Sequence, residues 1–361
     1  MEGPSGSFVT SHAQDMAVVR TKTQWVLLIA LLALVFFGIP NLLSGSWLTW
    51  VCFAGIYIIA VEGINIITGY TGLVSLGHSA LVGVGAYISA ILTTQFGLSF
   101  WVAIIAAGLG ASLAGVLIGL TSLRVKGFYL ALITIAFQFV FTWAIGHGLA
   151  EWTGGNSGYP PFVSGMPSTI PYPSIGGFVF NSYFRMYFII MGFAVIMTFF
   201  AKNLARTKVG RAFVAIRDND VAAEAMGVSL LRYKLLAFSI GCFYAGVAGS
   251  LTAHLLLRLD ATQFTMNESL WYLAMMVIGG MGTALGPILG VLFFKGLEEI
   301  VSLIATQAAW AFPGLSGQLV ASMTLIATGL VVVLFFIFEP RGLAHRWALL
   351  KAYYRLWPFS Y

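Results

Sequence analysis

The amino-acid sequence predicts an all-α polytopic membrane protein. Hydrophobic residues make up 59% of its 361 residues and charged residues only 8%, a composition outside the range of soluble domains. A transmembrane helix needs about 20 mostly apolar residues, and many windows of the chain supply them. The first window, WVLLIALLALVFFGIPNLL from Trp25, contains no charged residue at all. We therefore expect that lipid, and not water, surrounds most of this chain.

Breaking the chain at charges, glycines and prolines gives about ten apolar segments, some of them short or interrupted by glycine-rich stretches. They lie at about residues 24–42, 47–67, 77–95, 99–121, 128–147, 183–201, 235–256, 268–281, 286–304 and 319–338. The first segment is long and no A-x-A-like cleavage site follows it. We therefore expect a retained helix and not a secretory signal.

The positions of the basic residues predict the orientation. If the N-terminus is cytoplasmic and every segment crosses, all of the 18 lysines and arginines except Arg185, Arg258 and Lys295 fall on the cytoplasmic side. This asymmetry is what the positive-inside rule describes. The long outer loop is a candidate lid or docking surface. The expected organisation is a cytoplasmic polar leader (1–23), a transmembrane domain (24–338) with an outer loop (148–182) and a cytoplasmic loop (202–234), and a basic, aromatic cytoplasmic tail (339–361).

Several function classes have no support in the sequence. A net charge of +6 does not indicate a nucleic-acid partner, because the basic residues cluster beside apolar segments. Cys52 and Cys242 lie in apolar runs, and the five histidines show no metal-ligand spacing, so we expect no disulfide and no metal site. The chain contains no G-x-x-x-x-G-K-[ST] phosphate-binding loop, so we do not expect it to hydrolyse ATP.

Two connections between segments are rich in glycine: GYTGLVSLGHSALVGVGAY from Gly69 and GGMGTALGPILG from Gly279. Unwound backbone at membrane depth is tolerated only where protein or a water-filled cavity satisfies its polar groups, so these stretches are expected to face the interior. Close helix packing through small residues is the alternative. On a solute path, backbone N–H groups at helix starts would bind a solute carboxylate. The candidate residues for such a path are Glu62, Gly69, Tyr70, Thr71, Gly72, Ser75, Gly77, His78, Gly279, Gly280, Gly282, Thr283 and Gly286.

Charged residues inside the apolar segments need an explanation, since each costs about 2.5 to 3.5 kcal/mol at a helix centre. Lys295 can reach Glu298 or Glu299 on its own helix, which indicates either a structural ion pair or a place on the solute path. Glu62 has no visible partner, and it either faces the cavity or bonds to the unwound glycine-rich backbone. His78 either donates to a solute carboxylate or packs as a hydrogen-bonded core histidine.

The stretch VGRAFVAIRDNDVAAEAMGVSLLRYK, residues 209–234, is unusually polar for this chain. Asp218 and Asp220 can accept hydrogen bonds from free N–H groups at a helix start, and Gly227 suits a left-handed C-terminal cap. The helix between them has only about two turns, and a helix this short is marginal in water. We expect the membrane domain or a partner to hold it, with one apolar face formed by Val221, Ala222, Ala225 and Met226.

Several blocks follow one another along the chain: GYTGLVSLGHSALVGVGAY, LRVKGFYLALITIAF, TGGNSG, RTKVGRAFVAIRDNDVAAEAMGVSLLRYKLLAFSIGCFYAGVAGSL, VIGGMGTALGPILG and FEPRGL. In this order, from about residue 45 to 343, they resemble the permease subunit of bacterial branched-chain amino acid ABC importers, the LivM-like group. Members of this family import branched-chain amino acids, and close cousins carry urea, short amides or other small polar solutes.

The resemblance implies the ABC importer permease fold, in a multi-pass subunit of the bacterial inner membrane that moves such a solute into the cytoplasm by alternating access. The subunit would not be an enzyme and would hold no cofactor itself. The implied partners are a second homologous permease, two ABC ATPase subunits that bind ATP and Mg²⁺, a periplasmic solute-binding protein and the lipid bilayer.

The resemblance also implies a role for the polar stretch. In ABC importers a cytoplasmic EAA-x-x-x-G pattern forms the coupling helix that sits in a cleft of the ATPase. Val221, Ala222, Ala223 and Gly227 keep this spacing, with valine in place of glutamate. From the residue types alone, an amphipathic helix on anionic lipid would be an equal interpretation. The polar contacts around the coupling helix would come from Arg211, Arg217, Asp218, Asp220 and Glu224.

A rival function of another class is an ion-coupled secondary transporter that acts without ATPase subunits. Its discontinuous helices would look similar, and Glu62 or the Lys295 group could couple protons. An intramembrane enzyme is disfavoured, because the sequence offers no convincing pair of nucleophile and base and no metal cluster.

Overall fold

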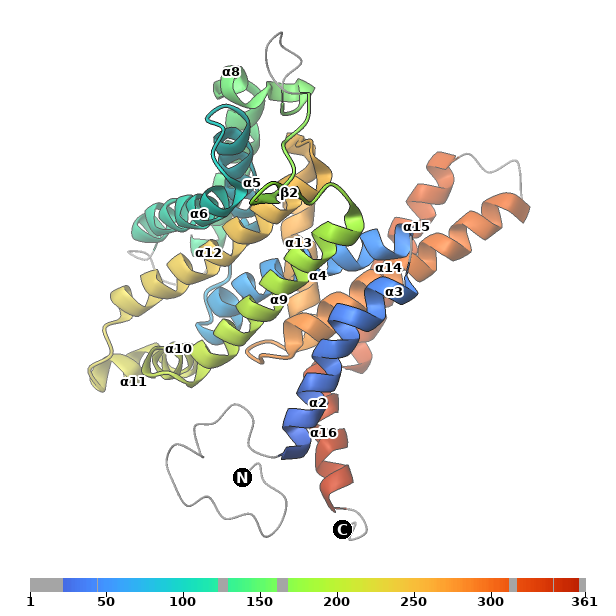
Figure 1. Ribbon diagram of the computed structural model, residues 1–361. Coiled ribbons are helices and arrows are strands. Elements are labelled where there is room, and N and C mark those ends of the chain that lie inside the picture. The colour runs from blue at the N-terminus through green and yellow to red at the C-terminus, as the bar shows by residue number, and fades with distance from the viewer. Residues whose placement is uncertain are drawn as a thin grey trace.

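Figure 1 shows a computed structural model of the chain, which describes residues 22–43, 45–122, 129–160, 168–311, 317–339 and 341–356. The described residues are mainly helical, as the sequence predicted. Residues 1–21 of the leader, Arg124, Lys126 and the end of the tail from residue 357 lie outside the described residues, so the predictions for them stay predictions.

Every predicted apolar segment contains a helix. In chain order these are α2 (Lys22–Ala33) continued by η1 (Leu34–Gly38) and α3 (Ile39–Leu42), α4 (Ser46–Ile64) continued by η2 (Asn65–Tyr70), α5 (His78–Thr94), α6 (Phe100–Ser122), α7 (Tyr129–Trp143) continued by η3 (Ala144–Gly148), α9 (Tyr183–Arg206), α12 (Leu230–Leu256), α13 (Met266–Gly279), α14 (Gly286–Ala311) and α15 (Gly317–Phe338). The connections hold α8 (Ala150–Thr153), η4 (Gly155–Ser157), a hairpin of β1 (Ser174–Ile175) and β2 (Phe178–Val179), α10 (Lys208–Asp218), α11 (Asp220–Ala225) and η5 (Ala261–Gln263), and α16 (Leu343–Leu356) follows α15.

Within the described ranges, six helices are long and apolar enough to cross a membrane, and a seventh candidate arises if α15 and α16 form one span bent by 46°. The other segments fall short for visible reasons. α5 has 17 residues and α13 has 14, while α14 contains Lys295, Glu298 and Glu299. The fold is thus that of a polytopic helical membrane protein.

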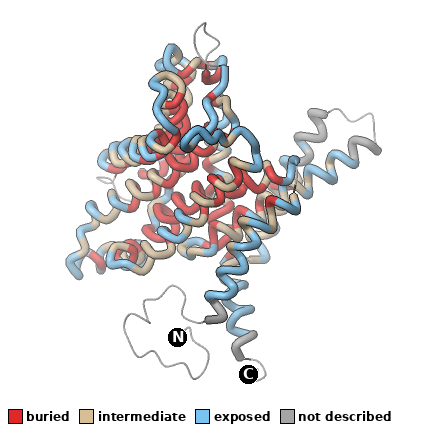
Figure 2. Tube along the Cα trace, viewed as in Figure 1, coloured by how far each residue is buried: buried red, intermediate tan, exposed pale blue. Residues whose placement is uncertain are grey.

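The helix α4 lies at the centre of the bundle. It packs against α9, α12, α13 and α14, and every residue from Ile59 to Thr71 is buried. α12 packs in turn against α5 and α6. Figure 2 shows buried residues gathered in the central helices, whereas α2 is largely exposed. The exposed side chains of the outer helices are large and apolar, such as Leu27 and Leu113, as expected where lipid replaces water.

Glycines set the distance between α5, α6 and α12. A Cβ atom added to Gly85 would collide with the backbone of Gly246, and one added to Gly246 would collide with the carbonyl of Ala107. A Cβ atom on Gly249 would collide with the carbonyl of Val82. Helix backbones approach this closely in membranes only through small residues. The end of the first glycine-rich stretch therefore serves helix packing, which was one of the two interpretations of that stretch.

Figure 1 places the start of α2 and the end of α16 at the same end of the molecule as α10 and α11. The opposite end carries α8 and the β-hairpin. The polar loop 202–234 and both terminal helices thus share one side of the bundle, and the prediction that this side is cytoplasmic stays a prediction.

The described part of loop 148–182 is fastened to the end of α12. Tyr159 and Leu259 exchange backbone hydrogen bonds of 2.7 and 2.8 Å. The buried His254 ring bonds to the carbonyl of Pro171 at 2.8 Å, and Arg258 donates to the carbonyl of Ser157 at 2.7 Å. Loop residues 161–167 lie outside the described residues. A role as lid or docking surface stays a prediction.

We predict that Gly246→Val destabilises the protein, because overpacking where α12 meets α5 and α6 costs about 1–3 kcal/mol. The measurement is thermal unfolding of the purified protein in detergent. Gly192→Val on α9 is the matched control, because a Cβ atom added at Gly192 meets no atom within 4 Å. An equal loss of stability in both variants would contradict the packing role of Gly246.

Candidate functional site

The polar loop 202–234 folds into α10 and α11, which lie against the end of the bundle. The side-chain oxygen of Thr207 begins α10 by accepting a hydrogen bond from the N–H of Gly210 at 3.2 Å. Phe213 of α10 is fully buried, and its ring packs edge-on against Tyr233 of α12 with 6.4 Å between the ring centroids. The chain's own helices therefore hold α10, and α11, the short helix of the prediction, contacts α10 and α12.

The N-terminal cap of α11 differs from the prediction. The side chain of Asn219 accepts a hydrogen bond from the N–H of Ala222 at 3.0 Å, whereas Asp218 ends α10 and Asp220 is the first residue of α11. Asn219 has the extended backbone that a capping residue needs, because α10 ends one residue earlier. The predicted left-handed cap at Gly227 is present, with φ of +86°.

The apolar face of α11 points away from the bundle. Val221 is 70% exposed and Met226 is 85% exposed, and Ala222 and Ala225 beside them are exposed as well. Ala223, on the opposite side, is buried. Exposed apolar side chains at the tip of a polar loop are typical of a protein contact surface. We call Val221, Ala222, Ala225 and Met226 the α11 face.

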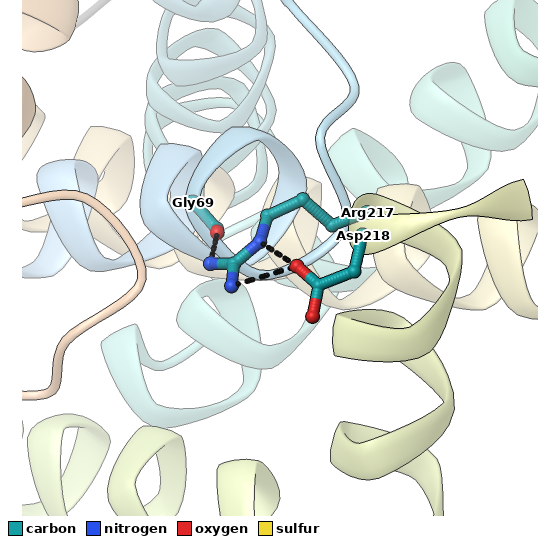
Figure 3. A network of polar contacts seen from close by, with 3 residues as sticks. All are labelled: Gly69, Arg217 and Asp218. Atoms are coloured by element: carbon teal, nitrogen blue, oxygen red, sulfur yellow. Dashed lines mark hydrogen bonds and ion pairs between the residues drawn. The ribbon is translucent and has the colours of Figure 1, made fainter.

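Arg217, at the end of α10, joins this loop to the membrane helices (Figure 3). Its Nη1 donates a hydrogen bond of 2.9 Å to the carbonyl of Gly69 at the end of η2. Its Nε and Nη2 donate to Oδ1 of Asp218 at 3.2 and 3.1 Å, which fixes the plane of the guanidinium. Gly72 lies against the side chain of Arg217 and has a left-handed φ of +75°, so both space and backbone favour glycine there.

Asn65 connects the same place to the turn between α13 and α14. Its Nδ2 donates to the carbonyl of Thr283 at 3.0 Å, and its Oδ1 accepts from the N–H of Gly282 at 2.9 Å. A Cβ atom on Gly69 would lie 2.7 Å from the nitrogen of Gly282, and one on Gly282 would lie 2.5 Å from Nη1 of Arg217. The end of η2, the α13–α14 turn and α10 therefore meet at one point, which we call the arginine junction.

The α13–α14 turn is closed by Thr283. Its hydroxyl donates to the carbonyl of Gly280 at 2.8 Å and accepts from the N–H of Gly286 at 3.0 Å. A Cβ atom added to Gly279 would collide with the backbone of Gly286. Gly342, just before α16, packs on Gly280. The second glycine-rich stretch is thus a compact turn, in which Thr283 itself is exposed.

The first glycine-rich stretch is helical through Tyr70 and non-helical from Thr71 to Gly77. Three N–H groups around the start of α5 already have partners within the protein. Leu76 donates to Oγ1 of Thr134 at 3.0 Å, Ser79 donates to Oγ of Ser269 at 2.9 Å, and Ala80 donates to Oε1 of Gln138 at 2.9 Å. In this conformation these N–H groups are occupied by α7 and α13, so a solute carboxylate would have to displace those side chains.

Glu62 and His78 are both fully buried. Neither carboxylate oxygen of Glu62 has a hydrogen-bond partner among the described residues, so it does not bond to the glycine-rich backbone. Nε2 of His78 lies 2.9 Å from the carbonyl of Ala60, while its Nδ1 has no partner in the described part of the chain. The hydroxyls of Tyr70 and Ser75 are likewise buried without a described partner.

The predicted intramembrane ion pair forms between Lys295 and Glu298, with 2.8 Å between Nζ and Oε2. Lys295 therefore uses the partner three residues away, and Glu299 makes no ion pair in the parts of the chain that the structure describes.

Asn65, Gln138 and Ser269 were not among the predicted site residues, although their side chains bond to the glycine-rich turn and to the start of α5. Each of them stands inside a predicted apolar segment. A polar side chain at such a position is unfavourable unless it has a partner or a function, and this signal could have identified them.

The comparisons with known proteins point to one family. The family described as branched-chain amino acid transport system / permease component matches residues 46–336. The high-affinity branched-chain amino acid transport system permease protein LivM of Escherichia coli (strain K12) is 31% identical over 324 residues, which cover 83% of this chain and 73% of that protein. The protein of the same name from Salmonella typhimurium is 32% identical over 269 residues, which cover 68% of this chain and 61% of that protein. A probable branched-chain amino acid transport permease protein LivM of Methanocaldococcus jannaschii is 24% identical over 325 residues, which cover 80% of this chain and 90% of that protein. No solved structure matches the chain.

We predict that Asn65→Leu opens the α13–α14 turn, because it removes two part-buried hydrogen bonds, to the N–H of Gly282 and the carbonyl of Thr283, at about 0.5–1.5 kcal/mol each. Hydrogen–deuterium exchange of residues 279–286 should become faster. Asn41→Leu is the control, because among the described residues the Asn41 amide bonds to the carbonyl of Phe37, four residues earlier in the chain. Unchanged exchange in Asn65→Leu would contradict this role of Asn65.

Proposed function

The chain belongs to the family of branched-chain amino acid transport permease components, and we propose that it is one permease subunit of an ATP-driven ABC importer. It would move branched-chain amino acids or a related small polar solute into the cytoplasm by alternating access. The observation that carries the proposal is the exposed α11 face, which is linked through Arg217 to the helices of the membrane bundle.

The proposed topology has about ten spans, both termini and α10–α11 in the cytoplasm, and loop 148–182 in the periplasm of a bacterium. If consecutive helices cross the membrane in opposite directions, α2, α10, α11 and α16 fall on the same side of it. This agrees with Figure 1, which places these helices at one end of the molecule. The short helices α5 and α13 would cross while covered by their neighbours, since their buried faces contact other helices and not lipid.

The α11 face would dock into a cleft of an ATPase subunit. The alternative is a contact with anionic lipid, and the charges around the face argue against it. Loop 202–234 carries seven basic residues, which anionic lipid would attract, but Asp218, Asp220 and Glu224 lie in or directly beside α11, where a negatively charged membrane would repel their carboxylates. A mixture of both signs around a small apolar centre is the pattern of a protein interface.

Force would pass from the ATPase to the bundle through the arginine junction. Asp220, at the start of α11, lies 3.9 Å from Nζ of Lys234 at the start of α12, and Arg217 reaches the carbonyl of Gly69. A displacement of α10 and α11 therefore acts on η2 and, through Asn65, on the α13–α14 turn. These are ends of helices that line the centre of the bundle.

The proposed complex contains a second homologous permease, two ABC ATPase subunits and a periplasmic solute-binding protein. ATP and Mg²⁺ would bind to the ATPase subunits, which supply the chemical step. This chain would supply the passage through the membrane and the contact that opens and closes it.

One observation favours a second candidate function. Glu62 is a fully buried carboxyl group without a hydrogen-bond partner in the described residues, and such a group in a membrane span is a candidate proton carrier. An ion-coupled transporter would take up solute in liposomes that contain only this chain, driven by a proton or sodium gradient. An ABC permease subunit would not.

We predict that Ala222→Arg and Ala225→Arg each reduce assembly with the ATPase subunits and ATP-driven uptake by at least about tenfold, because a buried unpaired charge costs several kcal/mol at an interface. Copurification and uptake in proteoliposomes measure the two effects. Ser229→Arg, at an exposed position of the same loop outside the α11 face, adds the same charge and should leave both nearly unchanged. Normal assembly of the alanine variants would refute docking through this face.

We predict that Arg217→Met reduces the amount of solute moved per ATP hydrolysed by the assembled complex by at least about tenfold, because it removes a charge-assisted hydrogen bond of about 1.5–3 kcal/mol. Parallel assays of uptake and ATP hydrolysis give this ratio. Lys208→Met removes an exposed positive charge from the same helix away from Gly69 and serves as the control. The same ratio in Arg217→Met and in the unaltered protein would disprove transmission through this side chain.

A further inference from the structure

A cavity of about 110 Å³ lies between α13, α14 and α15, away from the α11 face and the arginine junction. Three charged side chains stand in its lining, Glu268 from α13 and Lys295 and Glu298 from α14. The rest of its lining is Thr328 and the apolar residues Trp271, Met275, Phe294 and Leu325. The lining therefore divides into a charged part and an apolar part.

The charged part is an ordered network and not a single ion pair. Lys295 Nζ lies 2.8 Å from Oε2 of Glu298 and 4.1 Å from the centroid of the Tyr57 ring. The hydroxyl of Tyr57 donates to Oε2 of Glu268 at 3.1 Å. Glu268 lines the same cavity as Lys295 and Glu298. One ammonium group and two carboxyl groups thus stand in one lining, contributed by α13 and α14.

A purely structural ion pair does not account for this arrangement. Lys295 and Glu298 alone would neutralise each other, whereas Glu268 is a further carboxyl group in the lining, and a polar group inside the bundle is expensive in a membrane unless it has a function or partners. The Glu298 side chain is moreover 48% exposed, whereas that of Lys295 is 16% exposed. A carboxylate in this position needs water, a ligand or a polar partner, because hydrocarbon would not solvate it.

The apolar part offers a surface for a hydrocarbon group. Trp271 and Phe294 are in contact, with 4.9 Å between their ring centroids, and Met275 lies one turn further along α13. A void of this volume has room for several non-hydrogen atoms, since one water needs about 10–15 Å³ of such space. A molecule that fits carries charges of both signs at one end and a small apolar group at the other.

We propose that this cavity binds an α-amino acid with a small apolar side chain, and this inference rests on the proposed transport function. Glu268 binds the ammonium group of the ligand, and Lys295 binds its carboxylate. Trp271, Met275 and Phe294 contact its side chain, and Tyr57 positions Glu268. The site lets the membrane subunit itself distinguish a zwitterion from an amine or an acid of the same shape.

The test uses the complex of permease and ATPase subunits in lipid nanodiscs, without a solute-binding protein, and a cysteine at position 328. Thr328 lines the cavity and is only 5% exposed, while Cys52 and Cys242 are buried, so labelling by a small water-soluble maleimide reports on the cavity. In Thr328→Cys, millimolar leucine should slow labelling at least about threefold through occupancy of the site. Isocaproate, which lacks the ammonium group, and isoamylamine, which lacks the carboxylate, should not slow it.

Variants of the network extend the comparison. In the Thr328→Cys background, Glu268→Gln and Lys295→Gln should each abolish protection by leucine. Glu299→Gln, on the same helix but outside the cavity lining, should keep it. Equal protection by the three compounds, or leucine protection that survives Glu268→Gln, overturns the inference, and the first of these results does not depend on the folding of any network variant.

The inference and the proposed function fail in different ways. Absence of protection in a complex that carries out ATP-driven leucine uptake overturns the binding site and leaves the importer function intact. Protection in a complete transporter that takes up no solute with ATP contradicts the importer function and leaves the site intact.

Discussion

The hydrogen bond from Arg217 to the carbonyl of Gly69 is the interaction on which the arrangement of one end of the molecule depends. A guanidinium that Asp218 holds in one plane can reach this carbonyl only if no side chain stands between α10 and η2. Glycine at positions 69, 72 and 282 provides that space. The two glycine-rich stretches and the polar loop are far apart in the sequence, but they are parts of one junction.

Local patterns predicted much of this end of the molecule. The apolar segments, the left-handed cap at Gly227 and the shared face of α11 follow from spacing within a few residues, and the structure has all three. The N-terminal cap was assigned to the wrong residue, because asparagine and aspartate cap helices about equally well. The choice of Asn219 depends on where α10 ends, because Asn219 is the residue with extended backbone between α10 and α11.

Contacts between distant segments could not be predicted in this way. The ion pair of Lys295 and Glu298 was foreseen because the partners are three residues apart on one helix. Tyr57 and Glu268, which complete the network, come from other helices and leave no mark near Lys295 in the sequence. The same holds for the start of α5. Gln138 and Ser269 accept hydrogen bonds from N–H groups there, in a region predicted to bind a solute carboxylate.

The helix α14 has one end in the arginine junction and carries the charged network further along. At 1.5 Å of rise per residue, Lys295 stands about 14 Å from Gly286, a distance over which an α-helix behaves as a stiff rod. Two binding events that bias the position of one rod are thermodynamically linked, and linkage is reciprocal. If occupancy of the cavity changes nucleotide-dependent docking at α11 by some factor, docking must change the affinity of the cavity for its ligand by the same factor. One coupling free energy therefore governs both the retention and the release of the solute.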